Sequence, residues 1–233
     1  MSTLAEPPQI IPSDLLLLAY RSGIFPMSDR RDDPEVFWVE PRERAILPLD
    51  NFRCSRSLAK AVRQDRFRVT LNTAFEDVIA ACAAPRPNYP ESWISGRIGA
   101  SYRALHMIGH AHSIECWQGD DLVGGLYGVS FDRVFCGESM FSRASNASKV
   151  ALAWLVALMR RGGYELLDCQ FITDHLASLG AVSLSQRLYL ERLRHATTPG
   201  PSGDLAGAYS GVVEEAGASS PGKLIAQSLT QTS

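Results

Sequence analysis

The strongest constraint on the fold is a long helical segment that separates two strand-like segments. Residues 147–161, ASKVALAWLVALMRR, form the body of this helix, with Asn146 or Ser145 as its N-cap and Gly162 as its stop. A strand-like segment ends at Gly137 before the helix, and the strand-like segment YELLDCQ follows it. A strand–helix–strand crossover commonly returns beside its starting strand, so we expect the two strands to be neighbours in one sheet.

The remaining pattern predicts an antiparallel sheet flanked by helices. The segment AHSIECWQGDDLVGGLYGVSFDRVFCGES is typical of two or three antiparallel strands joined at QGDD and SFDR. Helical spacing is found in DLLLLAYRSG, SRSLAKAVRQ, AFEDVIAACAA, RIGASYRALHMIG and DHLASLG, whereas RFRVTLN, pieces of VFWVEPRERAILPL and QRLYLERL are strand-like. The chain is therefore predicted to be an α+β protein.

The sequence divides into three parts. Residues 1–48 are too few to bury a full core alone and are expected to form a small N-terminal domain. Residues 49–195 hold most of the predicted helices and strands. Over residues 196–233 the composition shifts to Gly, Ser, Ala, Pro and Thr, which is typical of a flexible tail. The last residues, KLIAQSLTQTS, are apolar enough to pack on the body, and the sequence leaves this alternative open.

Composition indicates a globular protein of a reducing compartment. Of the 233 residues, 45% are hydrophobic and 21% are charged, no apolar run approaches the length of a membrane span, and the N-terminus lacks the pattern of a signal peptide. The five cysteines are scattered without a C-x-x-C pair, which argues against a disulfide framework and a thiolate zinc site. We therefore expect a cytoplasmic protein with no membrane partner.

Three polar residues are predicted to share one rim of the sheet. Asp168 and Gln170 are two apart in a strand and so point to one face, and Glu138 follows the strand end at Gly137. Polar groups near a core are costly unless they are hydrogen-bonded. Beside apolar walls, such a cluster could hold an amine and an apolar group together. The alternative is that the three side chains only satisfy neighbouring backbone groups.

Other reactive residues fit structural roles better. Cys169 points to the opposite face from Asp168, so a thiol nucleophile with His175 as its base is disfavoured. The histidines of HMIGHAH straddle a helix end at Gly109 and share no helical face, which argues against a metal site. The glycines of VGGLYGV do not form a dinucleotide-binding motif and are expected to permit close backbone approach. The sequence thus predicts neither a metal nor a nucleotide cofactor.

A basic stripe is predicted on one helix. Arg56, Lys60 and Arg63 are spaced i, i+4, i+7 and project from one face. They lie within a segment, Arg42 to Arg68, that holds eight Lys and Arg residues against three acidic ones. On a chain with a net charge of −2, such a stripe is what a nucleic-acid phosphate backbone would contact. The alternative is an ordinary solvated helix face.

In combination, the motifs resemble the leucyl/phenylalanyl-tRNA–protein transferases. The resemblance covers residues 12–195 and is carried by AYRSGIFPM, SWISGRIGASYRALHMIGHAHSIECW, LVGGLYGV, FCGESMFSRASNASKVAL and DCQFITDHLASLGA. It implies an acetyltransferase-like (GNAT-type) catalytic domain that requires neither metal nor CoA. It also implies transfer of Leu, Phe and sometimes Met from aminoacyl-tRNA to the α-amino group of proteins that begin with Arg or Lys, which marks them for N-degron proteolysis.

The resemblance also implies roles for individual residues. Asp168, Gln170 and Glu138 fall at the catalytic centre. Trp93 is similar to a residue that stacks on the terminal adenosine of the tRNA. Met27 stands where some members have a second tryptophan, so this adenosine clamp is less aromatic here. The basic stripe is similar to positions that bind the tRNA acceptor stem. An apolar pocket for the aminoacyl side chain is implied at Leu126, Phe135, Met140, Leu155 and Leu167.

The donor implied by the resemblance is an activated ester, so the reaction needs no acyl-enzyme. We hypothesise that Asp168 and Gln170 hold the acceptor amine, Asp168 electrostatically and Gln170 by accepting a hydrogen bond, while the ribose hydroxyl beside the ester relays the proton. Glu138 is expected to bind the basic end of the acceptor. Two alternatives stay open at this point: a non-catalytic tRNA- or protein-binding module, and an N-acyltransferase that uses a CoA donor.

Overall fold

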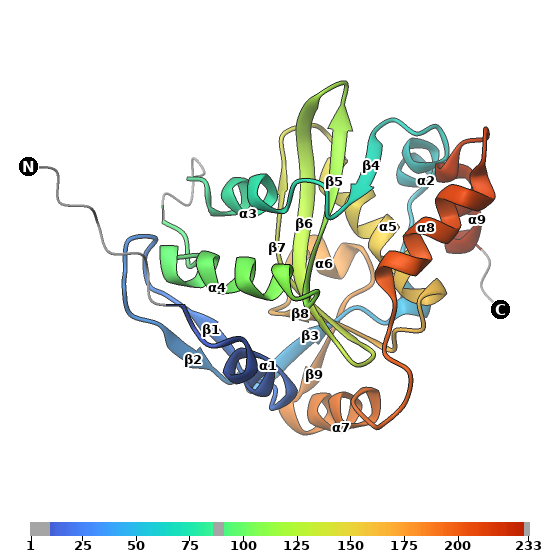
Figure 1. The fold of residues 1–233 in the computed structure, drawn as a ribbon. Coiled ribbons are helices and arrows are strands. Elements are labelled where there is room, and N and C mark those ends of the chain that lie inside the picture. Colours follow the sequence, from blue (N-terminus) through green and yellow to red (C-terminus); the bar gives the residue numbers. More distant parts are fainter. Residues whose placement is uncertain (1–9, 86–90, 231–233) are drawn as a thin grey trace, which may run out of the picture.

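The computed structural model describes residues 10–85 and 91–230 of the chain, which form an α+β protein (Figure 1). The helices are α1 (Ser13–Arg21), the short 3-10 helix η1 (Leu49–Asn51), α2 (Arg56–Arg63), α3 (Phe75–Ala83), α4 (Gly96–Met107), α5 (Ala147–Arg161), α6 (Asp174–Ser178), α7 (Gln186–Ala196), α8 (Leu205–Ala216) and α9 (Pro221–Thr230). The strands are β1 (Phe25–Met27), β2 (Phe37–Val39), β3 (Glu43–Ile46), β4 (Arg68–Leu71), β5 (Ala111–Gln118), β6 (Asp121–Phe131), β7 (Val134–Ser142), β8 (Leu166–Gln170) and β9 (Val182–Ser185).

Seven of these strands form the central sheet, in the order β4-β5-β6-β7-β8-β3-β9. Neighbouring strands are antiparallel except β7 and β8, which are parallel and are joined by the crossover helix α5. The predicted strand–helix–strand unit and the predicted antiparallel strands are therefore confirmed. The predicted strand end at Gly137 is wrong, because β7 continues to Ser142 and Glu138 lies within it. Strands β1 and β2 form a separate two-stranded sheet.

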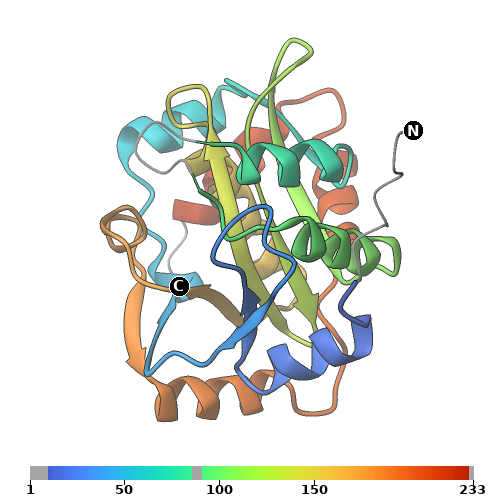
Figure 2. The same ribbon diagram turned by 90° about the vertical axis from the view of Figure 1, so that its left-hand side faces the viewer.

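Helices cover both faces of the central sheet (Figures 1 and 2). On one face, called here the α5 face, side chains of α5, α2, α8 and α9 share one hydrophobic cluster with the sheet. On the other, called the α4 face, a second cluster joins the sheet to α1, α3, α4 and α7 and contains four buried tyrosines, Tyr20, Tyr102, Tyr127 and Tyr189. Among the described residues, no helix has the length and apolarity that crossing a membrane requires.

The N-terminal segment supplies a strand to the central sheet. Strand β3 ends at Ile46, within the part of the sequence expected to form a small N-terminal domain, yet it lies between β8 and β9. Ala45 is paired with Gln170 on one side and with Ser183 on the other. The N-terminal segment is thus built into the sheet beside the residues predicted to be catalytic.

The prediction of a last strand in QRLYLERL is wrong, because this segment forms helix α7. Its buried residues are Tyr189, Leu193 and Ala196, which are spaced i, i+4, i+7 and so face the core from one side of a helix. The alternation of Leu188, Tyr189 and Leu190 resembles a strand only locally. A short strand that the sequence did not indicate, β9, comes directly before the helix.

The prediction of a flexible tail is also wrong for the described residues after 196. Helices α8 and α9 pack on α5, and α9 packs on α2. Leu205, Val212, Ile225 and Leu229 are buried by these contacts. The alternative that the sequence left open, apolar residues packing back on the body, is what residues 223–230 do; residues 231–233 lie outside the described part.

Candidate active site

The polar trio Asp168, Gln170 and Glu138 lies where strands β7 and β8 part. The parallel pairing of the two strands ends with Cys136 opposite Asp168, so Glu138 and Gln170 lie just beyond the last paired residues. All three side chains are buried, at 0% exposure for Asp168 and 7% for the other two. The side chain of Gln170 bridges the gap, since its Nε2 donates to Glu138 Oε1 at 2.9 Å. The structure therefore brings together the three residues that the sequence predicted to share one rim.

Asp168 is held by a buried arginine from β3. Arg44 Nε donates to Asp168 Oδ1 at 2.9 Å and Arg44 Nη2 donates to Oδ2 at 2.6 Å, a two-pronged ion pair with 1% exposure on the arginine side. The hydroxyl of Tyr189 in α7 donates a hydrogen bond to Asp168 Oδ2 at 3.0 Å. Burial alone would lower the pKa of Arg44, but the charge of Asp168, its hydrogen bonds with Arg44 and the nearby Tyr189 and Cys136 together raise that pKa, so the guanidinium stays charged.

The Arg44 guanidinium is itself enclosed. Its central carbon lies 4.6 Å from the ring centroid of Phe25 and 4.7 Å from that of Tyr189, a sandwich that favours a cation. Arg44 Nη1 also donates to the carbonyl of Gly23 at 3.1 Å. The ion pair therefore connects the α1–β1 junction, β3, β8 and α7 at one point.

The backbone of Gln170 is fixed in an unusual conformation. Its φ is 62°, in the left-handed region that side chains other than glycine seldom occupy. The N–H of Gln170 donates to Asp168 Oδ1 at 2.9 Å, and this bond stabilises the turn at the end of β8. With Nε2 bound to Glu138, Oε1 is the remaining polar atom of the Gln170 side chain. The site thus presents one oriented amide oxygen.

Glu138 is surrounded by hydroxyl groups. Tyr20 Oη lies 2.8 Å from Glu138 Oε1, and Tyr102 Oη lies 2.9 Å from Oε2. Burial raises the pKa of Glu138 to about 7, although its hydrogen bonds with Tyr20, Gln170 and Tyr102 counteract part of that effect. The expectation that Glu138 binds the basic end of an acceptor stays a prediction.

Sequence reasoning missed four members of this site: Arg44, Tyr20, Tyr102 and Tyr189. Tyr20 and Tyr102 lie inside the stretches AYRSGIFPM and SYRALH, which carry the family resemblance. That resemblance was the signal in the sequence that could have identified them as site residues. Arg44 was counted in the basic segment from Arg42 to Arg68, but it is buried and does not belong to a surface stripe. Tyr189 was assigned to a strand.

The five residues predicted to line an aminoacyl pocket share the hydrophobic cluster of the α5 face. Met140, on the part of β7 beyond its pairing with β8, is the half-buried member. The other four are 0–3% exposed and packed among α5 and the sheet: Leu126, Phe135, Leu155 and Leu167. Since Leu167 and Asp168 are successive strand residues, the apolar set and the polar trio occupy opposite faces that meet at the gap between β7 and β8.

Met27 and Trp93 come from segments that lie side by side. Ser28 Oγ donates to Ser95 Oγ at 2.9 Å, and the N–H of Gly96 donates to the carbonyl of Arg31 at 3.2 Å. Met27 and Trp93 are each half-buried against the cluster of the α4 face. The two residues predicted to clamp an adenosine are thus on adjacent segments.

The predicted basic stripe is exposed on α2. Arg56, Lys60 and Arg63 all face solvent, while Leu58 and Val62 bury the opposite side of the helix. The helix begins where the sequence indicated, since the Ser55 side chain accepts from the N–H of residue 58.

The residues given structural roles by the sequence have structural contacts. Burial raises the pKa of the Cys169 thiol, which disfavours a thiolate nucleophile. His106 and His110 are hydrogen-bonded to backbone carbonyls, and Asn72 contacts His112 Nδ1 at 2.9 Å. A Cβ on Gly124 would collide with Ala147 at the start of α5, so this glycine permits close approach of strand and helix.

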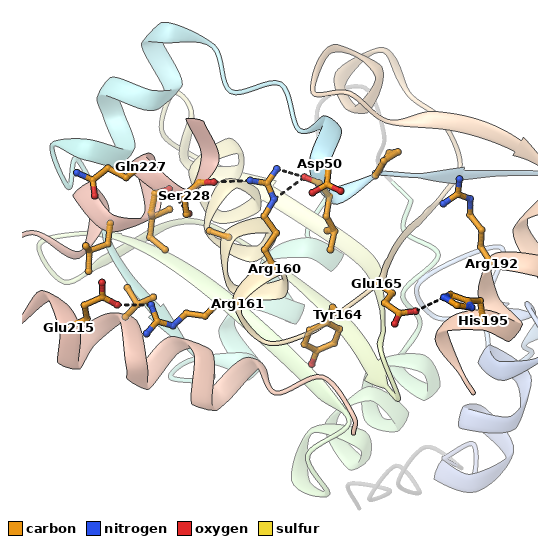
Figure 3. Close-up of a pocket in the computed structure, with 16 residues that line it drawn as sticks. Asp50, Arg160, Arg161, Tyr164, Glu165, Arg192, His195, Glu215, Gln227 and Ser228 are labelled. Atoms are coloured by element: carbon orange, nitrogen blue, oxygen red, sulfur yellow. Dashed lines mark hydrogen bonds and ion pairs between the residues drawn. The ribbon is translucent and has the colours of Figure 1, made fainter. Parts of the chain in front are cut away.

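A cavity of about 1140 Å³ lies away from the trio, between the end of α5 and helices α7, α8 and α9 (Figure 3). Two pairs of its charged side chains contact each other: Arg161 with Glu215 at 2.7 Å, and His195 with Glu165 at 3.5 Å. None of the trio lines it, so this cavity is not part of the candidate site.

Comparison with known proteins identifies the family. Residues 46–194 match the family model described as leucyl/phenylalanyl-tRNA protein transferase, and residues 11–42 match the model of the N-terminal domain of the same family. A leucyl/phenylalanyl-tRNA–protein transferase of Novosphingobium aromaticivorans is 59% identical over 97% of this chain and 98% of its own. That of Zymomonas mobilis is 59% identical over 81% of this chain and 70% of its own.

A solved structure of a functionally unknown conserved protein from Staphylococcus epidermidis aligns with a TM-score of 0.40 at 10% identity, over 76% of this chain and 66% of that chain. The assignment therefore rests on the sequence relatives and the family models. The family model matched to residues 46–194 contains Glu138, Asp168 and Gln170, whereas Arg44 falls between the two matched ranges. The chain belongs to the leucyl/phenylalanyl-tRNA–protein transferase family.

Proposed function

We propose that the chain transfers Leu, Phe and Met from aminoacyl-tRNA to the α-amino group of proteins that begin with Arg or Lys, and so marks them for N-degron proteolysis. The observation that carries this proposal is the Gln170 amide, which is fixed at the gap between β7 and β8 through both its backbone N–H and its side-chain nitrogen. A polar group fixed in this way is suited to orient a reacting amine, and a pure binding module has no need of it.

The reaction requires positioning rather than a protein nucleophile, because the aminoacyl ester of the donor is already activated. Gln170 Oε1 accepts a hydrogen bond from the acceptor amine, which has a pKa of about 8 and is partly neutral at pH 7. The amine nitrogen attacks the ester carbonyl carbon and forms the C–N bond. The bond from this carbon to the ribose oxygen then breaks, and the amine proton passes to that oxygen through the neighbouring ribose hydroxyl.

Asp168 acts in this mechanism by positioning Gln170, and not by holding the amine electrostatically as expected from the sequence, because its carboxylate is buried and engaged by Arg44. Arg44 neutralises its carboxylate, and Oδ1 holds the Gln170 N–H at 2.9 Å. Glu138 fixes the other end of the same residue through Nε2. The two carboxyl groups therefore set the direction of the amide oxygen that meets the amine.

For the catalytic part of the chain we propose a GNAT-type fold. Support comes from the mixed sheet whose parallel strands β7 and β8 diverge beyond Cys136 and Asp168. The aminoacyl side chain enters at this gap towards the α5 face, where Met140 is half-buried and the other apolar residues of the predicted pocket follow. The ester carbonyl then lies near Gln170, between the two faces.

The proposed tRNA contacts follow from the sequence, from the half-buried positions of Trp93 and Met27 on adjacent segments, and from the exposed basic stripe on α2. Trp93 and Met27 stack on the terminal adenosine, and Arg56, Lys60 and Arg63 contact phosphates of the acceptor stem. We also propose a division into residues 1–48, whose strand β3 joins the central sheet, residues 49–195, and residues 196–233, whose helices α8 and α9 pack on the body. We propose a cytoplasmic location as well, which the five free cysteines support. Neither a metal nor CoA takes part in the proposed reaction.

Transfer of labelled Leu or Phe from charged tRNA to a peptide beginning with Arg tests the proposal directly. We expect transfer to that peptide and to its Lys counterpart, and none to the same peptide with an acetylated N-terminus. No transfer to either peptide would contradict the proposed function. Heat from titration with acyl-CoA would favour a CoA-dependent N-acyltransferase instead.

The role of Gln170 has its own test. Gln170→Ala and Asp168→Asn should each lower the single-turnover rate of transfer by tenfold or more, about 1.4 kcal/mol of lost transition-state stabilisation. Gln170→Gly is the matched control for backbone strain, since glycine accepts a φ of 62° without cost yet also lacks the amide. Rates near wild type in Gln170→Ala and Asp168→Asn would contradict the mechanism.

A further inference from the structure

The side chains of Glu138, Tyr20 and Tyr102 form a closed ring of oxygen contacts. Tyr20 Oη lies 2.8 Å from Glu138 Oε1, Tyr102 Oη lies 2.9 Å from Glu138 Oε2, and the two tyrosine hydroxyls lie 2.7 Å apart. Both tyrosines are fully buried and Glu138 is 7% exposed. The ring is therefore enclosed by protein and lies against the Gln170 amide, which contacts Oε1 as well.

The number of protons in this ring indicates the protonation state of Glu138. Each hydroxyl oxygen carries one proton, so Tyr20 and Tyr102 supply two protons for three contacts. If Glu138 were ionised, one contact would bring two oxygen lone pairs within hydrogen-bond distance with no proton between them. A protonated Glu138 supplies the third proton. All three short contacts then become hydrogen bonds.

The direction of the hydrogen bonds follows from the fourth contact. Gln170 Nε2 and Tyr20 both approach Oε1, which fits a carbonyl oxygen with two lone pairs. Oε2 is then the acid hydroxyl and donates to Tyr102, Tyr102 donates to Tyr20, and Tyr20 donates to Oε1. Every polar atom of the ring is satisfied in this arrangement.

The surroundings of Glu138 favour its neutral form. Burial raises its pKa to about 7, and the Asp168 carboxylate adds to that effect. Arg44, the nearby cation, is already engaged by both oxygens of Asp168. The titratable or charged groups facing Glu138 are Tyr20 of α1, Tyr102 of α4, Tyr127 of β6, Cys136 of β7, and Asp168 of β8 with its partner Arg44 of β3.

We propose that Glu138 works as a neutral carboxylic acid, and that Tyr20 and Tyr102 are positioning residues that hold this acid, and through it the Gln170 amide, in place for transfer. Loss of the acid proton leaves one contact of the ring without a proton and loosens the support of Gln170. The part that concerns transfer rests on the proposed function, whereas the protonation state does not. A neutral Glu138 presents no charge to the acceptor, so this proposal replaces the expectation that Glu138 binds the basic end of the acceptor. Selectivity for Arg or Lys then comes from other groups.

Infrared difference spectroscopy of the full chain over a pH series tests the protonation state without any substrate. We expect the carbonyl stretching band of a protonated carboxyl group to be present at low pH and to disappear as the pH rises through about 7. Glu138→Gln assigns the band, because it should be missing from that variant. Absence of the band throughout the series, or its persistence in Glu138→Gln, would overturn the proposal.

The positioning role is tested with a matched pair of tyrosines. Tyr102→Phe removes a hydroxyl of the ring, whereas Tyr127→Phe removes an equally buried hydroxyl that has no hydrogen-bond partner among the described residues; the two rings are 5.5 Å apart. We expect Tyr102→Phe to lower the maximal single-turnover rate about tenfold, with the half-saturating concentrations of tRNA and peptide unchanged, and to shift the pH at which the Glu138 band is lost. Tyr127→Phe should stay within about twofold of wild type.

Equal behaviour of Tyr102→Phe and Tyr127→Phe in both rate and band would show that the ring has no special role. A failure of the proposed function would appear differently, as absent transfer in the wild-type chain beside an intact Glu138 band.

Discussion

At the scale of single residues, the buried pair of Arg44 and Asp168 has a direct consequence for stability. Removing one partner leaves the other charge without compensation in the interior, which typically costs about 3–5 kcal/mol. We expect Arg44→Met to lower the free energy of unfolding in urea by that amount. Arg44→Lys keeps the charge but not the two-pronged geometry and should lose less. Equal stability of wild type and Arg44→Met would contradict the role assigned to the pair.

Glu138 makes the stability of the protein depend on pH in a predictable direction. Its pKa rises from about 4.5 as a free side chain to about 7 in the folded chain. The folded state therefore binds the proton more tightly, and this contribution to stability is complete below about 4.5 and lost as the pH rises through 7. We expect the free energy of unfolding of Glu138→Gln to lack this decline. A pH dependence identical to wild type would contradict the raised pKa.

At the scale of elements, the parts of the fold that local pattern dictates were predictable. Helix α5 and the strands on either side of it follow from caps, length and periodicity, and so does the neighbourhood of Asp168, Gln170 and Glu138. Tyr20, Arg44 and Tyr189 could not be placed, because their partners are more than twenty residues away in sequence and are chosen by packing. Helix α7 was mistaken for a strand since only its contacts reveal which of its apolar residues face the core.

Helix α2 offers a prediction about tRNA binding. Its three exposed cations project from one face, so each should neutralise a phosphate and release a counterion. We expect the double variant Arg56→Ala with Arg63→Ala to weaken tRNA binding and to reduce the slope of log affinity against log salt by about 1.4–1.8. Arg187→Ala on α7, which is 74% exposed, is the matched control and should leave the slope unchanged. An unchanged slope in the double variant would remove α2 from the tRNA interface.

At the scale of the whole molecule, the C-terminal helices complete the layer that supports α2. Helix α9 lies against α2, and the N–H of Gly222 in α9 donates to Asp65 Oδ1, just after α2, at 2.9 Å. On its other side α9 contacts α5, where Arg160 donates to the carbonyl of Ser228 at 2.8 Å. The basic helix is thus held between α5 and a segment whose composition is typical of disorder. The glycines and alanines of this segment let helices approach closely. Composition alone does not distinguish this role from that of a flexible chain, because the same small residues are typical of both.

This packing predicts opposite outcomes for two neighbouring valines of α8. Val212 is 3% exposed and belongs to the cluster of the α5 face, whereas Val213 is 45% exposed. Val212→Ala should lower the free energy of unfolding by about 2 kcal/mol through lost burial and a residual cavity. Val213→Ala should change it by less than about 0.5 kcal/mol, because neither effect applies at an exposed site. Urea unfolding of the two variants measures the difference, and equal stabilities would mean that α8 does not pack on the body in solution.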